Sequence, residues 1–363
     1  MSSYIEYKDK VAFHPGYYIK EMVEESGLTQ EDFAKRLDTT PKNLSLLVRG
    51  EQNLSVDIAM KLSRLSGTSI GYWLNLQKGY EELKAEFASD KELEEERKVF
   101  DYLDYRYFRD NYGLKNYPKN KEKQIIEIRK FLEVSTIRVL PKKDMAANFR
   151  SKFSDMSESN IAKANAMVQI ATNYALKIEA PKYDKKRFER AIEFALTQTA
   201  NHKDFYDVIR NEFMKAGVIF IILPNMPGSN TSGATKKIGN NIMLMVNDRR
   251  GYADTIWFTM FHEIGHIINS DFGISFDEEE GALEEKADLY ARDMLIPPQA
   301  YCEFISKRNF DIEAIKEFAK EIDRDPGIVL GRLQNDKMVG YTNKALNSLR
   351  HKYKVKIINS CSY

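Results

Sequence analysis

The first 80 residues alternate between short segments with periodic apolar positions and single glycines. Gly27, Gly50 and Gly67 separate these segments, and apolar side chains recur inside each segment every three or four residues. That period is typical of amphipathic helices, and glycine commonly follows the last helical residue. We therefore predict a set of short helices in this part of the chain.

Residues 28–50 show the pattern of two short helices joined by a tight turn. Thr29 is suited to cap the first helix and Thr40 the second, with Pro41 at the first position of the second helix. Asp38 stands at the turn, where a residue that tolerates positive φ is needed. The positions expected to face inward are Phe33, Ala34, Leu37, Leu44, Leu47 and Val48. This arrangement predicts a helix-turn-helix.

Residues 81–110 combine an acidic composition with apolar residues at helical spacing. The acidic positions include Glu81, Glu82, Glu86 and the run 92–96. The plainest interpretation is a solvated connecting helix with one apolar face. Two alternatives remain open: a strip that mimics DNA or docks on a basic patch, and a helix that only dimerises the protein while DNA binding is vestigial. Residues 116–120 then predict a break.

The rest of the chain is mainly helical in pattern, with two predicted strands. Apolar residues recur at helical spacing over 161–178 and 187–197. Residues 217–224 are β-branched and bounded by Gly and Pro, which indicates a buried strand, and 241–247 predict a second strand. A loop is expected over 227–235, where Gly, Ser, Thr and Asn are frequent. After Gly251 the helical period returns and continues to about residue 353.

Composition excludes a polyelectrolyte and a membrane-spanning chain. The 363 residues include 55 Lys and Arg against 54 Asp and Glu, which gives a net charge of +1 and no overall signal for nucleic acid or membrane binding. No apolar run approaches the roughly 20 residues that cross a bilayer. With two cysteines, Cys302 and Cys361, one disulfide is possible but a disulfide framework is not, so we expect a cytoplasmic protein.

Histidine is scarce, and two of the five histidines stand four residues apart in the sequence Phe-His-Glu-Ile-Gly-His. On a helix, His262 and His266 lie one turn apart on the same face and can share one metal ion. Glu263 lies beside the pair, where it can take a proton from water. Gly265 costs about 1 kcal/mol relative to Ala in a helix, which suggests a close approach of another backbone. The alternative is a pair of ordinary core histidines.

A catalytic metal also needs a third protein ligand. Downstream, Ala287, Ala291 and Tyr290 mark the inward face of a predicted helix, and Glu284 falls on that face. We predict Glu284 as the third ligand and Asp288, one turn later, as the group that orients a ligating histidine. The alternative is that these acids only solvate a surface helix.

These motifs resemble those of the ImmA/IrrE family of metallopeptidases. The resemblance rests on the segments 261–266, 284–291, 294–297 and 326–334 and spans roughly residues 140–350. It implies a zincin fold and a zinc-dependent, gluzincin-like endopeptidase that cuts a helix-turn-helix repressor. Zinc is the expected metal, although the ligand set does not exclude manganese.

Two parts of the predicted peptidase site stay open. By residue type alone, His202, Tyr252 and Tyr290 are candidates to stabilise the oxyanion of the transition state. The predicted strand 241–247 either binds an extended peptide by strand addition or is purely internal.

The outward side of the predicted second helix of the helix-turn-helix carries polar and basic residues. Asn and Ser hydrogen-bond base edges, Lys and Arg reach phosphates or guanine, and Gln at the start of the first helix suits a phosphate. The candidate DNA contacts are Gln30, Thr40, Lys42, Asn43, Ser45 and Arg49. The alternative is a small helical protein-interaction module, because the charges of this region balance.

Residues 10–80 resemble the XRE helix-turn-helix of HigA-type antitoxins. The resemblance is carried by the segments 14–17, 27–30, 67–69 and 72–77. It implies a dimer that binds operator DNA and often neutralises a toxin. We expect His14 to be a structural cap and not a metal ligand.

Together these patterns predict a multidomain cytoplasmic regulator. An all-α helix-turn-helix domain (1–80), an acidic helical connector (81–137) and an α+β zincin-like peptidase domain (138–363) follow one another. We expect operator DNA, a protein substrate such as a repressor or a toxin–antitoxin partner, a second copy of the chain, and no membrane. The alternative function is a metal-binding antitoxin or repressor that binds DNA and a partner protein without cleaving it.

Overall fold

The computed structural model describes residues 4–143, 145, 157–276 and 281–357. The chain forms two compact units, Met1–Glu95 and Glu96–Tyr363. The predicted connector 81–137 is therefore not a separate unit, because its first part belongs to the first unit and the remainder to the second. Within the described ranges, every helix is too short or too polar to cross a bilayer.

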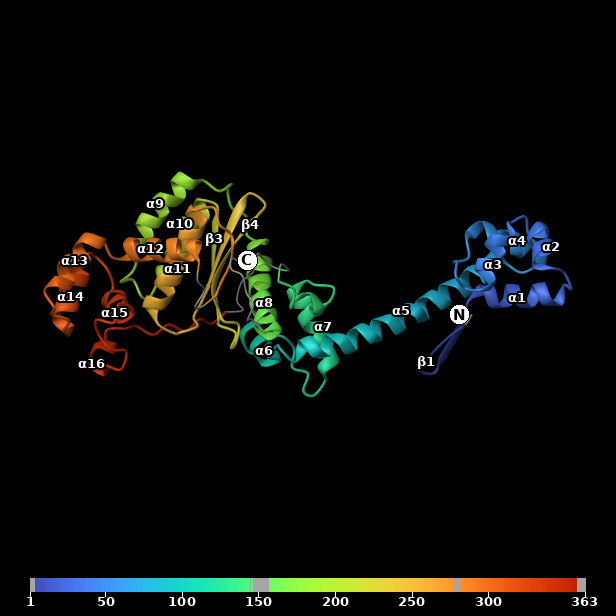
Figure 1. Ribbon diagram of the computed structural model, residues 1–363, viewed down its shortest axis with the longest axis horizontal. Helices are drawn as coiled ribbons and strands as arrows, with labels where there is room; N and C mark the ends of the chain where they lie inside the picture. The colour runs from blue at the N-terminus through green and yellow to red at the C-terminus, as the bar shows by residue number, and fades with distance from the viewer. Residues whose placement is uncertain (1–3, 144, 146–156, 277–280, 358–363) are drawn as a thin grey trace. The chain divides into compact units, whose positions relative to one another are not determined.

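The first unit contains the predicted short helices and a β-hairpin that the sequence pattern did not predict (Figure 1). The expectation of an all-α domain is wrong here, because Tyr4–Tyr7 (β1) pairs with Lys10–Phe13 (β2) in an antiparallel ladder. The helices of this unit are α1 (Pro15–Glu25), α2 (Gln30–Arg36), α3 (Pro41–Val48), α4 (Val56–Ser66) and the first part of α5 (Ile70–Phe100).

The predicted helix-turn-helix is confirmed in its caps and its turn. Thr29 accepts a hydrogen bond from the backbone of Asp32, and Thr40 accepts one from the backbone of Asn43. Asp38 has a φ of 52°, as expected for a residue at the tight turn. His14 is the N-cap of α1, because its Nδ1 accepts a hydrogen bond from the amide of Gly16 at 3.0 Å. All six apolar positions predicted to face inward are buried in one core with Trp73.

The acidic residues of α5 contact the hairpin of the same unit. The carboxylate of Glu86 lies 2.8 Å from Nζ of Lys10, and that of Asp90 lies 2.5 Å from Nζ of Lys8. The helix predicted over 81–110 in fact begins at Ile70 and ends at Phe100. It ends there because residues 101–104 form a turn and Asp104 caps the next helix, α6 (Tyr105–Tyr112).

The second unit begins with helices that pack beside a four-stranded sheet. Glu96 is 1% exposed, accepts a hydrogen bond from the backbone of Ile137 and pairs with Arg129 at 2.7 Å. This buried ion pair joins the end of α5 to the helices that follow. The first helices of this unit are α6, α7 (Lys121–Leu132), a 3-10 turn (Ile137–Val139) and α8 (Glu158–Ala175).

The sheet has the order β3-β5-β4-β6 and contains both predicted strands. These two strands are β3 (Val218–Leu223) and β5 (Asn241–Asn247), and they are parallel to each other. The loop predicted over 227–235 is wrong for its second part, because Thr231–Ile238 form β4, antiparallel to β5. Its Gly, Ser and Thr residues suggested a loop, but Thr231 and Thr235 are buried in the sheet. The edge strand β6 (Gly273–Phe276) interrupts a stretch predicted to be helical.

Helices cover both faces of this sheet (Figure 1). α8 contacts β3, β4 and β5 on one face, where the Thr172 hydroxyl lies 3.9 Å from the sulfur of Met243. The opposite face carries Val218, Phe220 and Leu244 in a core shared with α11. The remaining helices are α9 (Lys185–Leu196), α10 (Phe205–Lys215), α11 (Ala253–Ile268), α12 (Ala282–Leu295), α13 (Pro298–Ser306), α14 (Ile312–Glu321), α15 (Pro326–Asn335) and α16 (Lys344–Asn347).

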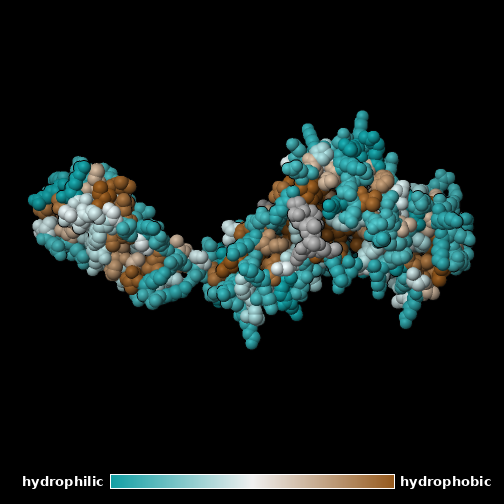
Figure 2. All heavy atoms as spheres, turned by 180° about the vertical axis from the view of Figure 1, so that it is seen from behind, coloured by the Kyte–Doolittle hydropathy of each residue, from teal (hydrophilic) through white to brown (hydrophobic). Residues whose placement is uncertain are grey.

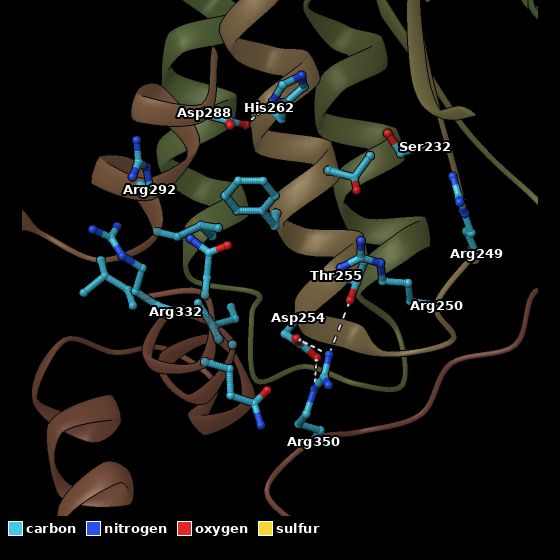
Figure 3. A pocket seen from close by; sticks show the side chains of 18 of the residues that line it. Ser232, Arg249, Arg250, Asp254, Thr255, His262, Asp288, Arg292, Arg332 and Arg350 are labelled. Carbon is cyan, nitrogen blue, oxygen red and sulfur yellow. Dashed lines mark hydrogen bonds and ion pairs between the residues drawn. The ribbon is translucent and has the colours of Figure 1, made fainter. Parts of the chain in front are cut away.

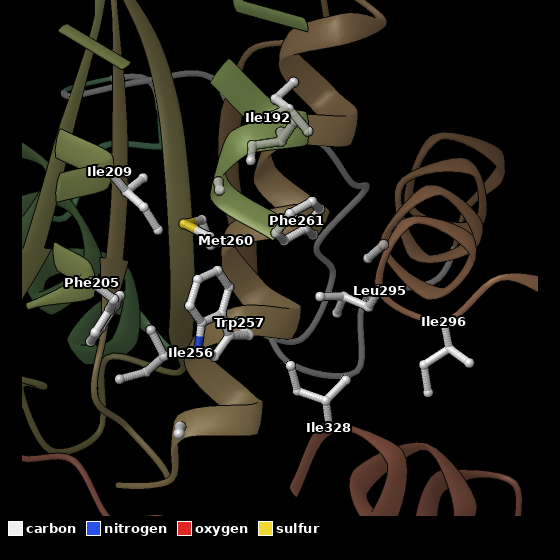
Figure 4. Packing of buried hydrophobic residues seen from close by; sticks show 14 of the residues in the cluster. Ile192, Phe205, Ile209, Ile256, Trp257, Met260, Phe261, Leu295, Ile296 and Ile328 are labelled. Carbon is white, nitrogen blue, oxygen red and sulfur yellow. The ribbon is translucent and has the colours of Figure 1, made fainter. Parts of the chain in front are cut away.

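The core around α11 fixes the helix that carries the His-Glu-x-x-His motif. Trp257, Met260 and Phe261 are fully buried among residues of α10, α12 and α15 (Figure 4). Burying a large apolar side chain contributes about 1.5–3 kcal/mol, so these three residues anchor α11 strongly. On the face shown in Figure 2, each unit is mainly hydrophilic with separate apolar patches.

Candidate metal centre and nucleic-acid interface

The three predicted metal ligands converge between α11 and α12. The Nε2 atoms of His262 and His266 lie 3.1 Å apart. One carboxylate oxygen of Glu284 lies 2.9 Å from Nε2 of His262, and the other lies 3.4 Å from Nε2 of His266. The sequence reasoning that placed Glu284 on the inward face of its helix therefore agrees with the structure.

Both histidine rings are held by a carboxylate at the other ring nitrogen. Asp288 lies 2.8 Å from Nδ1 of His262, as the sequence predicted. Asp271 lies 2.9 Å from Nδ1 of His266, and sequence reasoning did not find this contact. Asp271 follows the end of α11. In the sequence, only its position five residues after His266 could have indicated this contact. A carboxylate on Nδ1 fixes the ring and directs Nε2 toward the shared centre.

The electrostatics of the centre come from burial and from these contacts. Burial lowers the pKa of His262, but hydrogen bonds to Asp288 and Glu284 outweigh burial and raise its pKa to about 10. Burial raises the pKa of Glu284, but hydrogen bonds from His262 and His266 outweigh this effect and lower its pKa to about 2. The imidazoles and carboxylates of the cluster are therefore in close electrostatic contact within a buried space.

The donor set fits a zinc ion. Two imidazoles and one carboxylate are the protein ligands of many catalytic zinc sites. Oε1 of Glu284 is buried, and its contact with Nε2 of His266 at 3.4 Å is too long or too poorly aligned to satisfy it. A buried oxygen held this loosely is costly unless a cation or a proton satisfies it. The same three side chains are one of the groups whose ligand atoms lie within 4.8 Å of one another.

Glu263 is fully buried beside the ligands and lies against a glycine of the sheet. A Cβ atom at Gly233 would stand 2.6 Å from Oε1 of Glu263. The strand β4 therefore needs glycine at this position to leave room for the Glu263 carboxylate. A carboxylate held next to a metal centre is placed to accept a proton.

Gly265 allows α11 and α12 to pack closely, as its position in the motif suggested. A Cβ atom at Gly265 would stand 3.1 Å from Cα of Ala287 and 3.3 Å from Cβ of Tyr290. This contact brings the α12 backbone, and Glu284 with it, to the histidines of α11.

A pocket of about 380 Å³ opens beside His262, Glu284 and Asp288 (Figure 3). Five arginines line it, against three carboxylates. Arg350 pairs with Asp254 through contacts of 3.0 and 2.6 Å. The arginines of the lining are Arg249, Arg250, Arg292, Arg332 and Arg350.

Arg292 is the arginine of this lining that lies on the same helix as Glu284 and Asp288. It stands one helical turn beyond Asp288, next to it in Figure 3. Its Nε is buried, and no hydrogen bond satisfies this atom among the described residues. A buried guanidinium nitrogen without an acceptor favours an anionic ligand in the pocket.

The three oxyanion candidates lie outside this pocket. His202 contacts Asp325 and Tyr353. Tyr252 is the N-cap of α11, and Tyr290 packs against the core, where burial raises its pKa to about 12. None of these three candidates therefore lines the pocket beside the proposed metal ligands. The strand 241–247 is also purely internal, because β5 pairs with β3 on one side and β4 on the other.

The candidate DNA contacts gather on α3 and at the start of α2. Lys42 is exposed, and Asn43 donates a hydrogen bond to the hydroxyl of Thr39 at 2.8 Å. Arg49 pairs with Glu51 at 3.1 Å. Gln30 and Thr40 are exposed at the first turns of α2 and α3, and Ser45 is partly buried. These residues share the outer side of the two helices, where a helix-turn-helix contacts DNA.

Comparison with known proteins matches the first unit. Residues 19–73 fit the helix-turn-helix family model. Over 83 residues the chain is 35% identical to the HTH-type transcriptional regulator YddM of Escherichia coli (strain K12), across 22% of this chain and 88% of that protein. It is 33% identical over 76 residues to virulence-associated protein I of Dichelobacter nodosus, across 21% of this chain and 70% of that protein. It is 35% identical over 69 residues to virulence-associated protein A′ of the same organism, across 19% and 60%.

Proposed function

The chain belongs to the helix-turn-helix family through its first unit, and we propose that it is a DNA-binding transcriptional regulator whose second unit is a zinc endopeptidase. The single observation that carries the peptidase proposal is the convergence of His262, His266 and Glu284 beside the buried carboxylate of Glu263. The resemblance of the same motifs to the ImmA/IrrE family supports it.

Operator binding is proposed for the outer side of α2 and α3. Lys42 and Arg49 supply charge for phosphates, whereas Asn43 and Ser45 supply hydrogen bonds for base edges. A second copy of the chain is proposed as the partner, since helix-turn-helix dimers read two half-sites. Exposed apolar side chains such as Leu65, at the end of α4, and Tyr72, at the start of α5, offer a surface for that contact.

In the proposed hydrolysis, His262, His266 and Glu284 hold the metal, and Asp288 and Asp271 keep the two rings oriented. A zinc ion bound there would supply Lewis acidity, which lowers the pKa of water and polarises the substrate carbonyl. Glu263 accepts the proton of the attacking water and passes it to the leaving amine. The buried position of Glu263 keeps this carboxylate fixed for both transfers.

The proposed substrate is a protein segment that carries acidic side chains. The five arginines of the pocket outnumber its carboxylates, and Arg292 offers a buried nitrogen next to the centre. Guanidinium groups bind carboxylates with paired hydrogen bonds. A repressor or antitoxin is the substrate class that the family resemblance implies.

A non-enzymatic metal-binding repressor or antitoxin is the second candidate. In this alternative the metal fixes the fold of the second unit, which grips a partner protein without cutting it. The buried carboxylate of Glu263 disfavours this alternative, because a structural metal site has no need of a base.

The test compares wild type with Glu263→Gln, both loaded with zinc and used as bait in an extract. We expect fragments of a substrate with wild type and the same protein, uncleaved and bound, with Glu263→Gln. Glu285→Gln, on the exposed side of α12, is the matched control and should cleave normally. Cleavage at the wild-type rate by Glu263→Gln would overturn the mechanism. A bound partner that wild type never cleaves would favour the non-enzymatic candidate.

A further inference from the structure

Four of the five histidines of the chain lie in two clusters, and the second cluster is made by His202, Asp325 and His351. The atoms of these three side chains that can bind a metal lie within 4.8 Å of one another. His351 accepts a backbone hydrogen bond from Ala253, at the start of α11. His262 is nine residues further along that helix, which corresponds to about 14 Å of helix length, so this cluster is distinct from the centre described above.

Both imidazoles of the second cluster contact the same carboxylate. Oδ2 of Asp325 lies 3.1 Å from Nε2 of His202 and 3.5 Å from Nδ1 of His351. The two imidazole rings stack with their centroids 3.5 Å apart. The hydroxyl of Tyr353 lies 2.7 Å from Nδ1 of His202. This contact fixes the ring and leaves Nε2 directed at the carboxylate, which is how metal-binding histidines are commonly held.

The charge of the cluster also favours a cation. Asp325 is 1% exposed, and its other oxygen accepts a hydrogen bond from the amide of Gly327. Its Oδ2 faces the two imidazoles. A buried carboxylate is stabilised when a cation or a hydrogen-bond donor neutralises it.

We propose that His202, Asp325 and His351 form a second metal site, which binds a divalent transition metal such as zinc. Two imidazoles and one carboxylate provide three ligands, and the half-exposed side of His351 leaves a fourth position for water. Unlike the first centre, this group includes an exposed ligand, His351, and among the described residues it contains no glutamate that corresponds to Glu263. The role of the second site is therefore to join segments and not to hydrolyse peptides.

The three ligands come from segments that are far apart in the chain. His202 precedes α10, Asp325 is the N-cap of α15, and His351 follows α16. A metal bound by all three would fasten the C-terminal segment to α15 and to the start of α11. The neighbouring Arg350 would be held with it, and Arg350 lines the pocket beside the first centre. Metal at the second site thus supports the wall of that pocket.

The test is zinc stoichiometry on the full chain, after removal of metal with a chelator and reloading with zinc alone. We expect two zinc ions per chain for wild type, one for His262→Ala, one for His351→Ala and none for the double variant. Zinc should raise the melting temperature of His262→Ala but not that of the double variant. His202→Ala is the second single variant and should also bind one zinc ion.

Lys354→Ala is the matched control, because Lys354 is exposed in the same segment and outside the cluster. It should bind two zinc ions. One zinc ion in wild type, unchanged by His351→Ala and His202→Ala, would overturn the second site. Loss of zinc in His351→Ala with none lost in His262→Ala would instead contradict the first centre, so the two proposals fail separately.

Discussion

The carboxylate of Asp271 lies 2.9 Å from Nδ1 of His266, and this contact holds the more deeply buried of the two motif histidines. His266 is 1% exposed, so its ring has few other polar partners that could orient it. Asp271 stands just beyond the C-terminal end of α11, so the two residues in contact are also close in the sequence.

We predict that Asp271→Asn weakens zinc binding at the first centre about 10–100-fold, the usual effect of removing a carboxylate behind a ligating histidine. The amide still fills the space but no longer supports the ring with a negative charge. Competition for zinc against a coloured chelator measures the effect. Asp293→Asn, exposed on α12, is the control and should bind zinc as wild type does. Equal affinity in both variants would show that Asp271 does not support His266.

A second prediction concerns the contact between β4 and the proposed base. Gly233→Ala places a methyl group where it meets the Glu263 carboxylate at 2.6 Å, so the carboxylate must move. Because the three nearest atoms all belong to Glu263 and not to a proposed metal ligand, we expect zinc stoichiometry to stay unchanged. Peptide cleavage should fall at least about 100-fold, since displacing a catalytic group by roughly 1 Å has that effect. Cleavage at the wild-type rate with a folded Gly233→Ala protein would contradict the role of Glu263.

The sequence pattern brought these side chains together correctly because its signals are local and periodic. The spacing of His262 and His266 and the helical period around Ala287 place three ligands and Asp288 by helix geometry alone. Asp271 was missed because it lies in a loop, where no periodicity applies. The cluster of His202, Asp325 and His351 was missed because only the tertiary fold brings those segments together.

The strands of the sheet also show that the sequence pattern finds local features and misses those that depend on the tertiary fold. β3 and β5 are apolar runs and were found, whereas β4 was predicted as a loop because of its Gly, Ser and Thr residues. In the structure, Gly233 makes space for Glu263, and Thr231 donates a hydrogen bond to the backbone oxygen of Ser275 in β6. The composition of β4 therefore reflects its position beside Glu263 and the proposed metal ligands, which no local propensity scale describes.

A third prediction tests the close packing of α11 on α12. Gly265→Val adds atoms where Ala287 and Tyr290 already lie within 3.3 Å of a Cβ position. We expect the free energy of unfolding of the second unit to fall by about 1–3 kcal/mol, as in other overpacked cores. Zinc affinity should fall as well, because α12 carries Glu284.

The matched control for that variant is Gly79→Val, in the exposed part of α5, where a new Cβ meets no atom within 4 Å. Valine is a slightly better helix former than glycine, so this change should alter stability by only a few tenths of a kcal/mol. Denaturant unfolding of both variants measures the difference. Equal stability of the two would show that the helices have room to separate.

A fourth prediction tests the proposed preference for acidic substrates. Arg292→Gln removes the guanidinium next to the centre, and we expect kcat/KM to fall about 10–100-fold for a peptide with acidic side chains, the loss typical of a charged hydrogen bond. A neutral peptide should be cleaved at a nearly unchanged rate. Arg190→Gln, exposed on α9 and outside the pocket, is the control for charge removal in general. An equal loss for both peptides would assign Arg292 a structural role.

The last prediction concerns DNA binding by α3 and uses its salt dependence. Lys42 is exposed and has no ion pair in the described part of the chain, whereas Arg49 is already paired with Glu51 at 3.1 Å. A lysine that neutralises one phosphate contributes about 0.9 to the slope of log K against log salt. Lys42→Ala should therefore reduce this slope by about 1 on a DNA fragment from the region upstream of its own gene. Arg49→Ala should reduce the slope less, because Arg49 must give up Glu51 to reach the DNA.

The control is Lys20→Ala, exposed on α1, which should leave the slope unchanged. Binding that does not vary with salt in the wild type would rule out DNA contact through this face.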